Sequence, residues 1–318
     1  MTRHKLTVAV TGSTGQQGGH LARRMLDHGH RVRALTRNPE TAASRALAAR
    51  GAEIVCVDLD SGDNLTAALQ GADAAFLVTT PFERGAEAEV EQANHFGEAA
   101  RAVALPHLVY TSVTEPMTQS PVEHFAAKGR AERALRELGL PMTIVGAPPF
   151  LDNVIAPWHL PWLRRGIYAV PGPMDFPMQW VATEDIAAMA AHVLEERDAY
   201  VGQRLDIASD ELSGREMMAA LERATGRPLR HESKRFADLD PMLGRLFAAI
   251  DMPMPERAPG AKSGHESRLN GPPSGVELGK LHADFSHIGW HRFSVWAEKQ
   301  DWPRLLGPPQ GMNARAAT

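Results

Sequence analysis

A glycine-rich segment near the start of the chain limits its fold more than any other feature. The apolar run 6–10 leads directly into Thr11-Gly12-Ser13-Thr14-Gly15-Gln16-Gln17-Gly18, behind which an amphipathic stretch begins. A strand, a glycine turn and a helix in this order predict the first βα unit of a parallel sheet. Gly12 permits a tight turn, Gly15 a close approach of the backbone to a bound group, and Gly18 close packing of helix and strand. The free N–H groups at the helix N-terminus favour an anion such as a pyrophosphate.

Short apolar runs alternate with longer amphipathic stretches up to about residue 150. The strands predicted from these runs are 6–10, 31–35, 53–57, 74–78, 107–111 and 142–145. This rhythm predicts the α/β class, with a doubly wound parallel Rossmann-type sheet whose ligand crevice lies at the carboxyl ends of the strands. Together with the glycine segment, it predicts that residues 1–150 form a dinucleotide-binding domain.

The regular alternation stops after residue 150, where proline and tryptophan become frequent. We expect residues 151–318 to form a smaller C-terminal α+β lobe for a substrate or a partner. Helical periodicity predicts a helix over 183–194, and Ser213 with Glu216 forms a capping box before another. The stretch 253–275 mixes Pro, Gly, Ser and charged residues without periodicity, which predicts a mobile loop.

Composition excludes several classes of partner. The 318 residues carry 34 basic and 38 acidic side chains without a basic cluster, so neither nucleic acid nor an anionic membrane is an expected partner. No apolar run approaches the roughly 18 residues that span a bilayer. The single cysteine, Cys56, follows apolar residues, so we expect it in the core of a cytoplasmic protein. The histidines His282, His287 and His291 lack the close spacing of metal ligands, and no metal is expected.

The end of the second predicted strand bears on the choice of cofactor. Arg37 stands about twenty residues past the glycines, where an NAD enzyme usually has an acid, and Asn38 follows it. A guanidinium can bind a 2′-phosphate through two parallel bonds, so NADP(H) is favoured, with NAD(H) as the alternative. The less favoured alternative is that Arg37 is a solvated surface residue. At the end of the third strand, Asp58 would accept the adenine amino group and Leu59 would contact the ring, unless both simply end a strand.

Several segments together resemble the NmrA-like family of atypical short-chain dehydrogenase/reductases. The resemblance rests on the segments 8–18, 36–39, 76–79, 124–129, 140–143, 149–153 and 200–203, which occur in collinear order. It covers most of the chain and is weakest over 253–275. The resemblance implies that Gly12 to Gly18 and Arg37 hold the cofactor, that Thr79 and Thr80 line its path and that Lys128 contacts it. With the residues argued from the strand ends, the predicted cofactor site is Thr11, Gly12, Thr14, Gly15, Gln16, Gln17, Gly18, Arg37, Asn38, Asp58, Leu59, Thr79, Thr80, Lys128 and Phe150.

The resemblance also implies the catalytic residues. Lys128 would bond the nicotinamide ribose, and relatives in the wider superfamily carry a proton-donating tyrosine four residues before this lysine. His124 stands at that place here. One helical turn puts both side chains on one face, so His124 either donates the proton in place of the tyrosine or packs against the sheet.

Aromatic residues are concentrated just behind residue 150. Phe150, Asn153, Trp158, Trp162, Phe176 and Trp180 are the candidate substrate residues. Large flat rings suit a planar aromatic substrate, but the same residues would equally serve as the core of the lobe or as a dimer surface.

Two functions from different classes fit these observations. The first is an NAD(P)H-dependent reductase of a quinone or conjugated aromatic carbonyl, a reaction that needs less proton donation than ketone reduction and so tolerates the missing tyrosine. As the resemblance implies, such a reductase could serve a two-component monooxygenation of an aromatic polyketide. The alternative is a non-catalytic NADP(H)-sensing regulator with a protein partner, and a homodimer fits either function. A nucleotide-sugar epimerase is disfavoured because it too needs the tyrosine.

Overall fold

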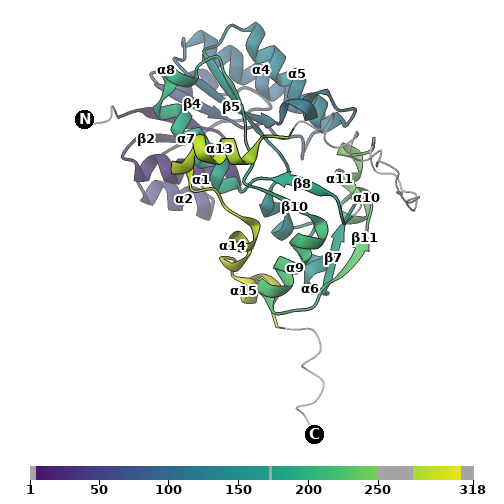
Figure 1. Ribbon diagram of the computed structural model, residues 1–318. Helices are drawn as coiled ribbons and strands as arrows, with labels where there is room; N and C mark the ends of the chain where they lie inside the picture. The colour runs from purple at the N-terminus through teal and green to yellow at the C-terminus, as the bar shows by residue number, and fades with distance from the viewer. Residues whose placement is uncertain (1–4, 172–173, 250–274, 309–318) are drawn as a thin grey trace. The chain divides into compact units, whose positions relative to one another are not determined.

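The computed structural model describes residues 5–171, 174–249 and 275–308, and the chain divides into two compact units (Figure 1). Unit 1 comprises Met1–Ala147 with Thr183–Ile207, and unit 2 comprises Pro148–Ala182 with Ala208–Thr318. The stretch 253–275, for which the sequence predicts a mobile loop, lies outside the described residues except for Gly275.

A parallel sheet of seven strands forms the centre of unit 1. Its order is β3-β2-β1-β4-β5-β6-β9, and every neighbouring pair is parallel. The strands are β1 (Thr7–Val10), β2 (Arg31–Thr36), β3 (Glu53–Cys56), β4 (Ala74–Leu77), β5 (Leu108–Val113), β6 (Met142–Ala147) and β9 (Arg204–Asp206). The strand order reverses between β1 and β4, the switch point at which ligands of doubly wound sheets bind. The predicted Rossmann-type class is confirmed.

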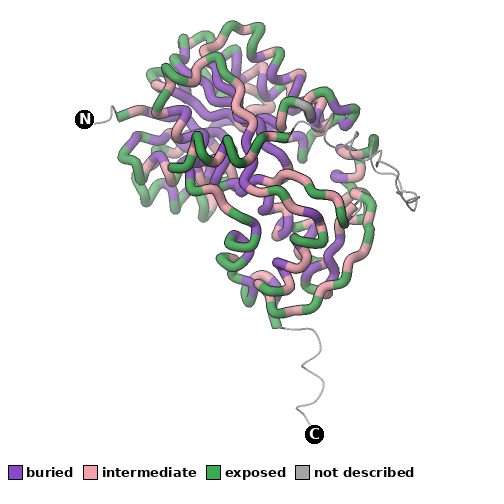
Figure 2. The backbone as a smooth tube through the Cα atoms, in the orientation of Figure 1, coloured by how far each residue is buried: buried purple, intermediate pink, exposed green. Residues whose placement is uncertain are grey.

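The first six strands coincide with the six predicted runs, whereas β9 was not predicted. β1, β4, β5 and β6 are buried along their whole length, as Figure 2 shows, which explains their continuous apolar sequences. By contrast, β9 carries Arg204 and Asp206. These charges are compatible with the sheet because Arg204 binds both carboxylate oxygens of Glu132, at 2.8 and 2.7 Å, and Asp206 at 2.9 Å.

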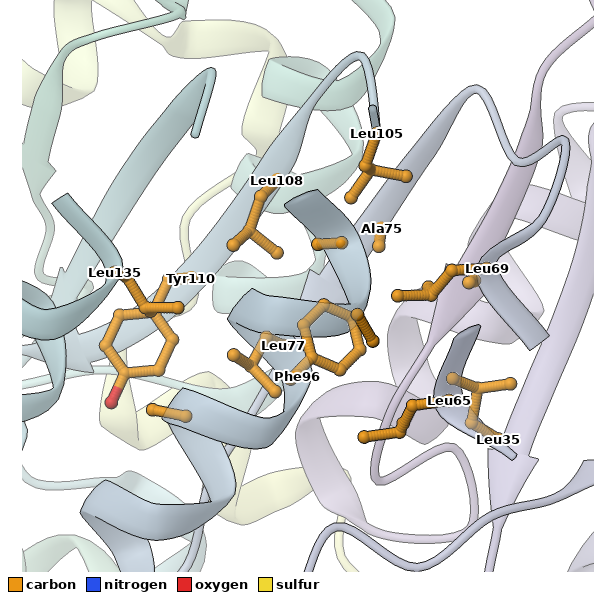
Figure 3. Close-up of a cluster of buried hydrophobic side chains, with 14 of the residues drawn as sticks. Leu35, Leu65, Leu69, Ala75, Leu77, Phe96, Leu105, Leu108, Tyr110 and Leu135 are labelled. Carbon is orange, nitrogen blue, oxygen red and sulfur yellow. The ribbon is translucent and has the colours of Figure 1, made fainter. Parts of the chain in front are cut away.

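Helices connect and cover the strands of unit 1. They are α1 (Gln16–Asp27), α2 (Ala42–Ala49), α3 (Leu65–Leu69), α4 (Ala86–Ala102), η1 (Glu115–Gln119), α5 (Glu123–Glu137), α7 (Thr183–Glu195) and α8 (Arg197–Tyr200). Leu77 and Tyr110 of the sheet share one apolar cluster with Leu65 of α3, Phe96 of α4 and Leu135 of α5 (Figure 3). Three successive crossover helices are thus anchored to the same part of the sheet.

Residues 183–207 correct the expected division of the chain. The sequence-based division placed them in the second lobe, yet α7 packs against α1 and β6, and β9 extends the sheet beside β6. The predicted helix over 183–194 is confirmed, but its apolar face is buried within unit 1. A linear boundary at residue 151 misses this return because the chain leaves unit 1 and re-enters it.

Cys56 corrects a second expectation, because its side chain is exposed and not in the core. It lies on β3, which is the edge strand of the sheet. An apolar run on an edge strand does not guarantee burial of each of its residues.

Unit 2 is a smaller α+β assembly. Its strands are β7 (Ile167–Val170), parallel to β11 (Arg230–Ser233), and β8 (Pro177–Trp180), antiparallel to β10 (Asp210–Ser213). Its helices are η2 (Leu151–Ile155), α6 (Leu160–Arg164), α9 (Gly214–Thr225), α10 (Phe236–Leu239), α11 (Pro241–Leu246), α13 (Leu278–Asp284), η3 (Ser286–Ile288), α14 (Phe293–Glu298) and α15 (Trp302–Leu306). The predicted capping box of Ser213 and Glu216 is confirmed at the start of α9. Within the described ranges, no helix is long and apolar enough to cross a membrane.

Candidate functional site

The glycine-rich turn has a backbone that only glycine fits at two of its positions. Gly12 has a φ of +57°, in the left-handed region that residues with a Cβ rarely adopt. A Cβ at Gly18 would lie 2.3 Å from the carbonyl oxygen of Thr11, closer than atoms can approach. The Oγ1 atom of Thr11 is buried and accepts a hydrogen bond from the Val78 N–H at 2.8 Å. Gly18 therefore lets α1 start against β1, and Thr11 joins the turn to the end of β4.

The N-terminus of α1 is suited to bind an anion. Its N-cap is Gly15, which has no side chain to satisfy the first-turn N–H groups, and the first turn contains no acidic residue. Thr14 and Gln16 are exposed, whereas Gln17 accepts a hydrogen bond from the Thr111 hydroxyl of β5 at 2.8 Å. Free N–H groups and an uncompensated helix dipole are what a pyrophosphate requires, so these residues fit a dinucleotide.

Arg37 directly follows β2 and is already paired. Its guanidinium binds both oxygens of Glu83, with Nη2 2.5 Å from Oε1 and Nη1 bound to Oε2. This hydrogen-bonded pairing raises the pKa of Arg37 and lowers the pKa of Glu83. The neighbouring Asn38 accepts a hydrogen bond from the Glu40 N–H through Oδ1 at 3.0 Å, so its amide oxygen shapes the loop.

The two residues proposed to contact adenine lie just beyond the end of β3, as expected. Asp58 accepts a hydrogen bond from the Asp60 N–H at 2.9 Å, and Leu59 packs at the margin of the large apolar cluster. Gln92 of α4 connects this loop to the end of β4, since it donates to Asp60 at 2.7 Å and accepts from the Thr80 N–H at 3.0 Å. The loops behind β3 and β4 are thereby held together.

Lys128 lies in a buried polar cluster with Thr79 and Glu89. Its ammonium is 2.8 Å from Oε1 of Glu89 and donates to the carbonyl and hydroxyl oxygens of Thr79, at 3.0 and 3.2 Å. These three acceptors match the three N–H bonds of an ammonium group. Glu89 is 0% exposed and Lys128 6%. Hydrogen bonds of this kind offset part of the cost of burying the Lys128 ammonium.

The cluster fixes the charge of its members. Burial alone would raise the pKa of Glu89, but the positive charge of Lys128 and the nearby His124 lower it to about 2. Burial would lower the pKa of Lys128, yet the Glu89 carboxylate raises it above its usual value. Lys128 is therefore a cation and Glu89 an anion throughout the physiological range.

His124 lies one turn before Lys128 on α5. Its Nδ1 atom is 3.3 Å from the second carboxylate oxygen of Glu89, and its side chain is 16% exposed. The ring lies beside those of Phe82 and Phe125, at centroid distances of 6.4 and 5.4 Å. The structure thus brings His124 and Lys128 to opposite oxygens of one buried carboxylate, and His124 reaches the surface.

Two members of this cluster were not singled out from the sequence. Glu89 occupies a core-facing position of α4, in line with the buried Gln92, Ala93 and Phe96. A carboxylate at such a position is a signal that helical periodicity could have provided. Tyr110 of β5 lies 3.1 Å from the Thr79 hydroxyl, and burial raises its pKa to about 12.

One further buried polar atom belongs to Ser112 on β5. Within the described ranges, its hydroxyl has no hydrogen-bond partner. A buried polar atom of this kind is one that a bound ligand can satisfy.

The residues predicted to contact the substrate lie in unit 2 and separate into groups. Trp158 and Trp162 line one pocket of about 330 Å³, together with Pro157, Pro161, Arg165, Asp238, Leu239 and Asp240. Trp180 packs against the core of unit 2 and donates through Nε1 to the Leu212 carbonyl at 3.4 Å. Phe176 is partly buried just before β8, and Phe150 and Asn153 lie at η2. The core interpretation therefore applies to Trp180.

His28, His30 and Glu195 form a group of metal-ligand type in unit 1. The Oε1 atom of Glu195 is 2.6 Å from His28 Nδ1 and 3.1 Å from His30 Nε2. However, Nδ1 of His30 accepts a hydrogen bond from the Leu6 N–H at 3.2 Å. Its Nε2 therefore carries the proton and donates to Glu195, so it has no lone pair for a metal. The group is a hydrogen-bonded link from the end of α7 to the turn between α1 and β2 and to the residue before β1.

The parallel sheet, the glycine turn and the charged cluster together define a Rossmann-type dinucleotide-binding protein of the short-chain dehydrogenase/reductase kind. More specifically, the sequence matches the NmrA-like family over residues 4–255, and the chain belongs to this family.

Comparisons with individual proteins agree with this membership. The chain is 34% identical over 233 residues to the (4-alkanoyl-5-oxo-2,5-dihydrofuran-3-yl)methyl phosphate reductase of Streptomyces griseus, which covers 71% of this chain and 76% of that protein. Among solved structures, the negative transcriptional regulator NmrA in complex with NAD superposes with a TM-score of 0.73 at 20% identity, covering 94% of this chain and 96% of NmrA. The NADPH-dependent quinone oxidoreductase QOR2 of Escherichia coli, complexed with NADPH, superposes with a TM-score of 0.63 at 22% identity, covering 95% of each chain. Family membership and the reductase relative identify the chain as an oxidoreductase.

Proposed function

We propose that this oxidoreductase uses NAD(P)H to reduce a quinone or another conjugated carbonyl. The observation that carries the proposal is the buried cluster in which His124 and Lys128 flank the Glu89 carboxylate. A buried charge cluster behind the ends of the central strands costs stability, so a structural role alone does not account for it.

The cofactor is NAD(P)H, with NADP(H) favoured. The turn from Gly12 to Gly18 and the N-terminus of α1 would hold the pyrophosphate, and Arg37 the 2′-phosphate. The loop behind β4, with Thr79 and Thr80, would line the path toward the nicotinamide. When bound, the cofactor supplies a hydride, which is a hydrogen nucleus with two electrons.

His124 is the group that we assign to proton delivery. A carbonyl oxygen of a quinone gains negative charge as the ring accepts the hydride, and this charge spreads over the conjugated system. A histidine proton then completes the hydroquinone, leaving His124 neutral until it takes a proton from water. Because Glu89 lies on the Nδ1 side of the ring, Nε2 is the nitrogen that donates.

Lys128 and Glu89 act on this step through position and charge. All three N–H bonds of Lys128 have acceptors inside the protein, so its ammonium keeps Glu89 ionised. The ionised Glu89 faces Nδ1 of His124 and orients its ring, as an acidic residue does for the histidine of a hydrolase triad. For Lys128 to bind the nicotinamide ribose as well, one of its bonds to Thr79 must exchange.

The substrate that we propose is a flat conjugated molecule. Aromatic rings such as Trp158 and Trp162, which line the pocket of unit 2, suit a flat conjugated molecule. The Streptomyces relative is named for an oxo-dihydrofuran that carries an alkanoyl group, and the Escherichia coli structure is named a quinone oxidoreductase. We further propose that the reduced product passes to a partner oxygenase, as in a two-component monooxygenation.

Anaerobic mixing with NADPH and a panel of quinones tests the proposal, with the nicotinamide absorbance followed over time. We expect oxidation of NADPH with at least one quinone. His124→Phe should lower kcat by about a hundredfold, the lower end of what a general acid contributes, while His124→Tyr, which restores the proton donor of the superfamily, should retain more activity.

The sensor hypothesis makes the opposite prediction. Tight binding of NADPH without oxidation by any quinone, together with equal nucleotide affinities of the wild type and the His124 variants, would contradict the reductase and favour the sensor.

A further inference from the structure

Glu83 is paired with Arg37, the residue proposed to bind the 2′-phosphate of the cofactor. We propose that Glu83 sets the preference between NADPH and NADH, because its carboxylate competes with the 2′-phosphate for Arg37. The inference rests on the proposed nucleotide site and assigns a role to a residue outside the glycine turn.

The carboxylate of Glu83 occupies the N–H bonds of Arg37 that a 2′-phosphate would use. Both terminal nitrogens of the Arg37 guanidinium bind Glu83, one to each carboxylate oxygen. A 2′-phosphate would use the same two parallel N–H bonds, since phosphate and carboxylate present oxygens to a guanidinium in the same manner. The two anions therefore cannot occupy the fork of Arg37 together.

The Arg37–Glu83 ion pair lies at the protein surface. The side chains of Arg37 and Glu83 are 54% and 55% exposed. Glu83 can therefore leave Arg37 for water without becoming an unpaired buried charge. Exchange of the carboxylate for a phosphate is a surface event with a small cost, which makes Glu83 a competitor and not a permanent block.

Further negative charges surround the Arg37–Glu83 pair. Asp58 and Asp60 lie close enough to raise the pKa of Arg37 through their negative charge, and Arg84 is 3.8 Å from Asp60. Among the described side chains, the carboxylates of Glu83, Asp58 and Asp60 thus all act on Arg37. A phosphate dianion enters against this negative field, whereas the uncharged ribose hydroxyls of NADH do not.

Binding of NADPH therefore has a cost that binding of NADH does not have. NADPH must displace Glu83 before Arg37 can bind its phosphate, whereas NADH leaves the ion pair intact. Loss of an exposed ion pair corresponds to a factor of about two to five in affinity. Glu83 thereby narrows the preference that Arg37 would otherwise give to NADPH and keeps NADH usable.

Fluorescence titrations of the full chain with NADPH and with NADH test this role, using the wild type, Glu83→Gln, Arg37→Gln and the double variant. Glu83→Gln should tighten NADPH binding about twofold to fivefold and leave NADH binding within a factor of two. Glu87→Gln removes another exposed carboxylate, on α4, where Glu87 pairs with Arg130, and serves as the control. It should leave both affinities unchanged.

The double variant separates competition from simple repulsion. If Glu83 acts by occupying Arg37, the gain from Glu83→Gln should vanish in the Arg37→Gln background. An equal gain in both backgrounds, or an unchanged ratio of the two affinities in Glu83→Gln, would overturn the proposal while the nucleotide site stands. If the wild type bound neither nucleotide, the proposed site itself would be wrong and the role of Glu83 with it.

Discussion

Replacement of Glu89 by glutamine is the perturbation that tests the buried cluster most deeply. A carboxyl whose pKa falls from 4.5 to about 2 on folding contributes about 3 kcal/mol to the free energy of unfolding at neutral pH. The variant also leaves the Lys128 ammonium buried without its counter-charge, which typically costs about 3–5 kcal/mol. Both routes predict that Glu89→Gln destabilises the protein by about 3–4 kcal/mol at pH 7.

The pH dependence has a defined sign. The pKa of Glu89 is depressed in the native protein, so its contribution is complete above pH 4.5 and is lost as the pH falls toward 2. The difference between the wild type and Glu89→Gln should therefore shrink below pH 4.5, by at most about 1.4 kcal/mol per pH unit. Urea denaturation between pH 7 and pH 3.5 measures it.

Two controls make this experiment specific. Glu87→Gln on the same helix removes a carboxylate whose side chain is 75% exposed and should change the stability by less than about 0.5 kcal/mol. Glu89→Leu combined with Lys128→Met removes both charges and should recover most of the loss. A Glu89→Gln variant within about 1 kcal/mol of the wild type, with the same pH dependence, would refute the reasoning.

Three further predictions concern other parts of unit 1. Arg204→Met should destabilise the protein by about 3 kcal/mol in urea denaturation, because the buried Glu132 loses its two-oxygen partner and keeps only Arg136, 3.7 Å away; a loss below about 1 kcal/mol would contradict the clamp on β9. Gly18→Ala should abolish NADPH binding in titrations, since its Cβ would meet the Thr11 carbonyl, and unaltered affinity would show that the turn adjusts. Native Cys56 is exposed and should react fully with a thiol reagent before any denaturant is added, whereas a thiol that reacts only on unfolding would return it to the core.

The sequence was most informative where strands are buried on both faces. The central strands are continuous apolar runs because helices cover both faces of the sheet, and such a run can be recognised from the local sequence alone. β9 escaped prediction because Arg204 and Asp206 look like surface residues until Glu132, 72 positions away in sequence, is seen to neutralise Arg204. Cys56 was misjudged for the converse reason, since the position of β3 at the sheet edge is a property of the strand order.

The functional site also combines residues that short motifs reveal with partners that only the fold brings close. The glycine turn, Arg37 and the spacing of His124 and Lys128 are visible as short motifs. The partners of these residues are not, because Glu83 and Glu89 come from another βα unit of the sheet. A motif identifies the group that can do chemistry, whereas the charge it carries depends on packing between distant segments.

The central claim is that the cluster of His124, Glu89 and Lys128 supports hydride transfer from a bound nicotinamide. The most direct test is a single-turnover experiment in which the protein saturated with NADPH, or with NADPH deuterated at the transferred position, is mixed anaerobically with a quinone. We predict that the nicotinamide absorbance decays within one turnover, more slowly with the deuterated cofactor, and more slowly again in His124→Phe. An absorbance that persists in the wild type, although titration shows that NADPH is bound, would contradict the account.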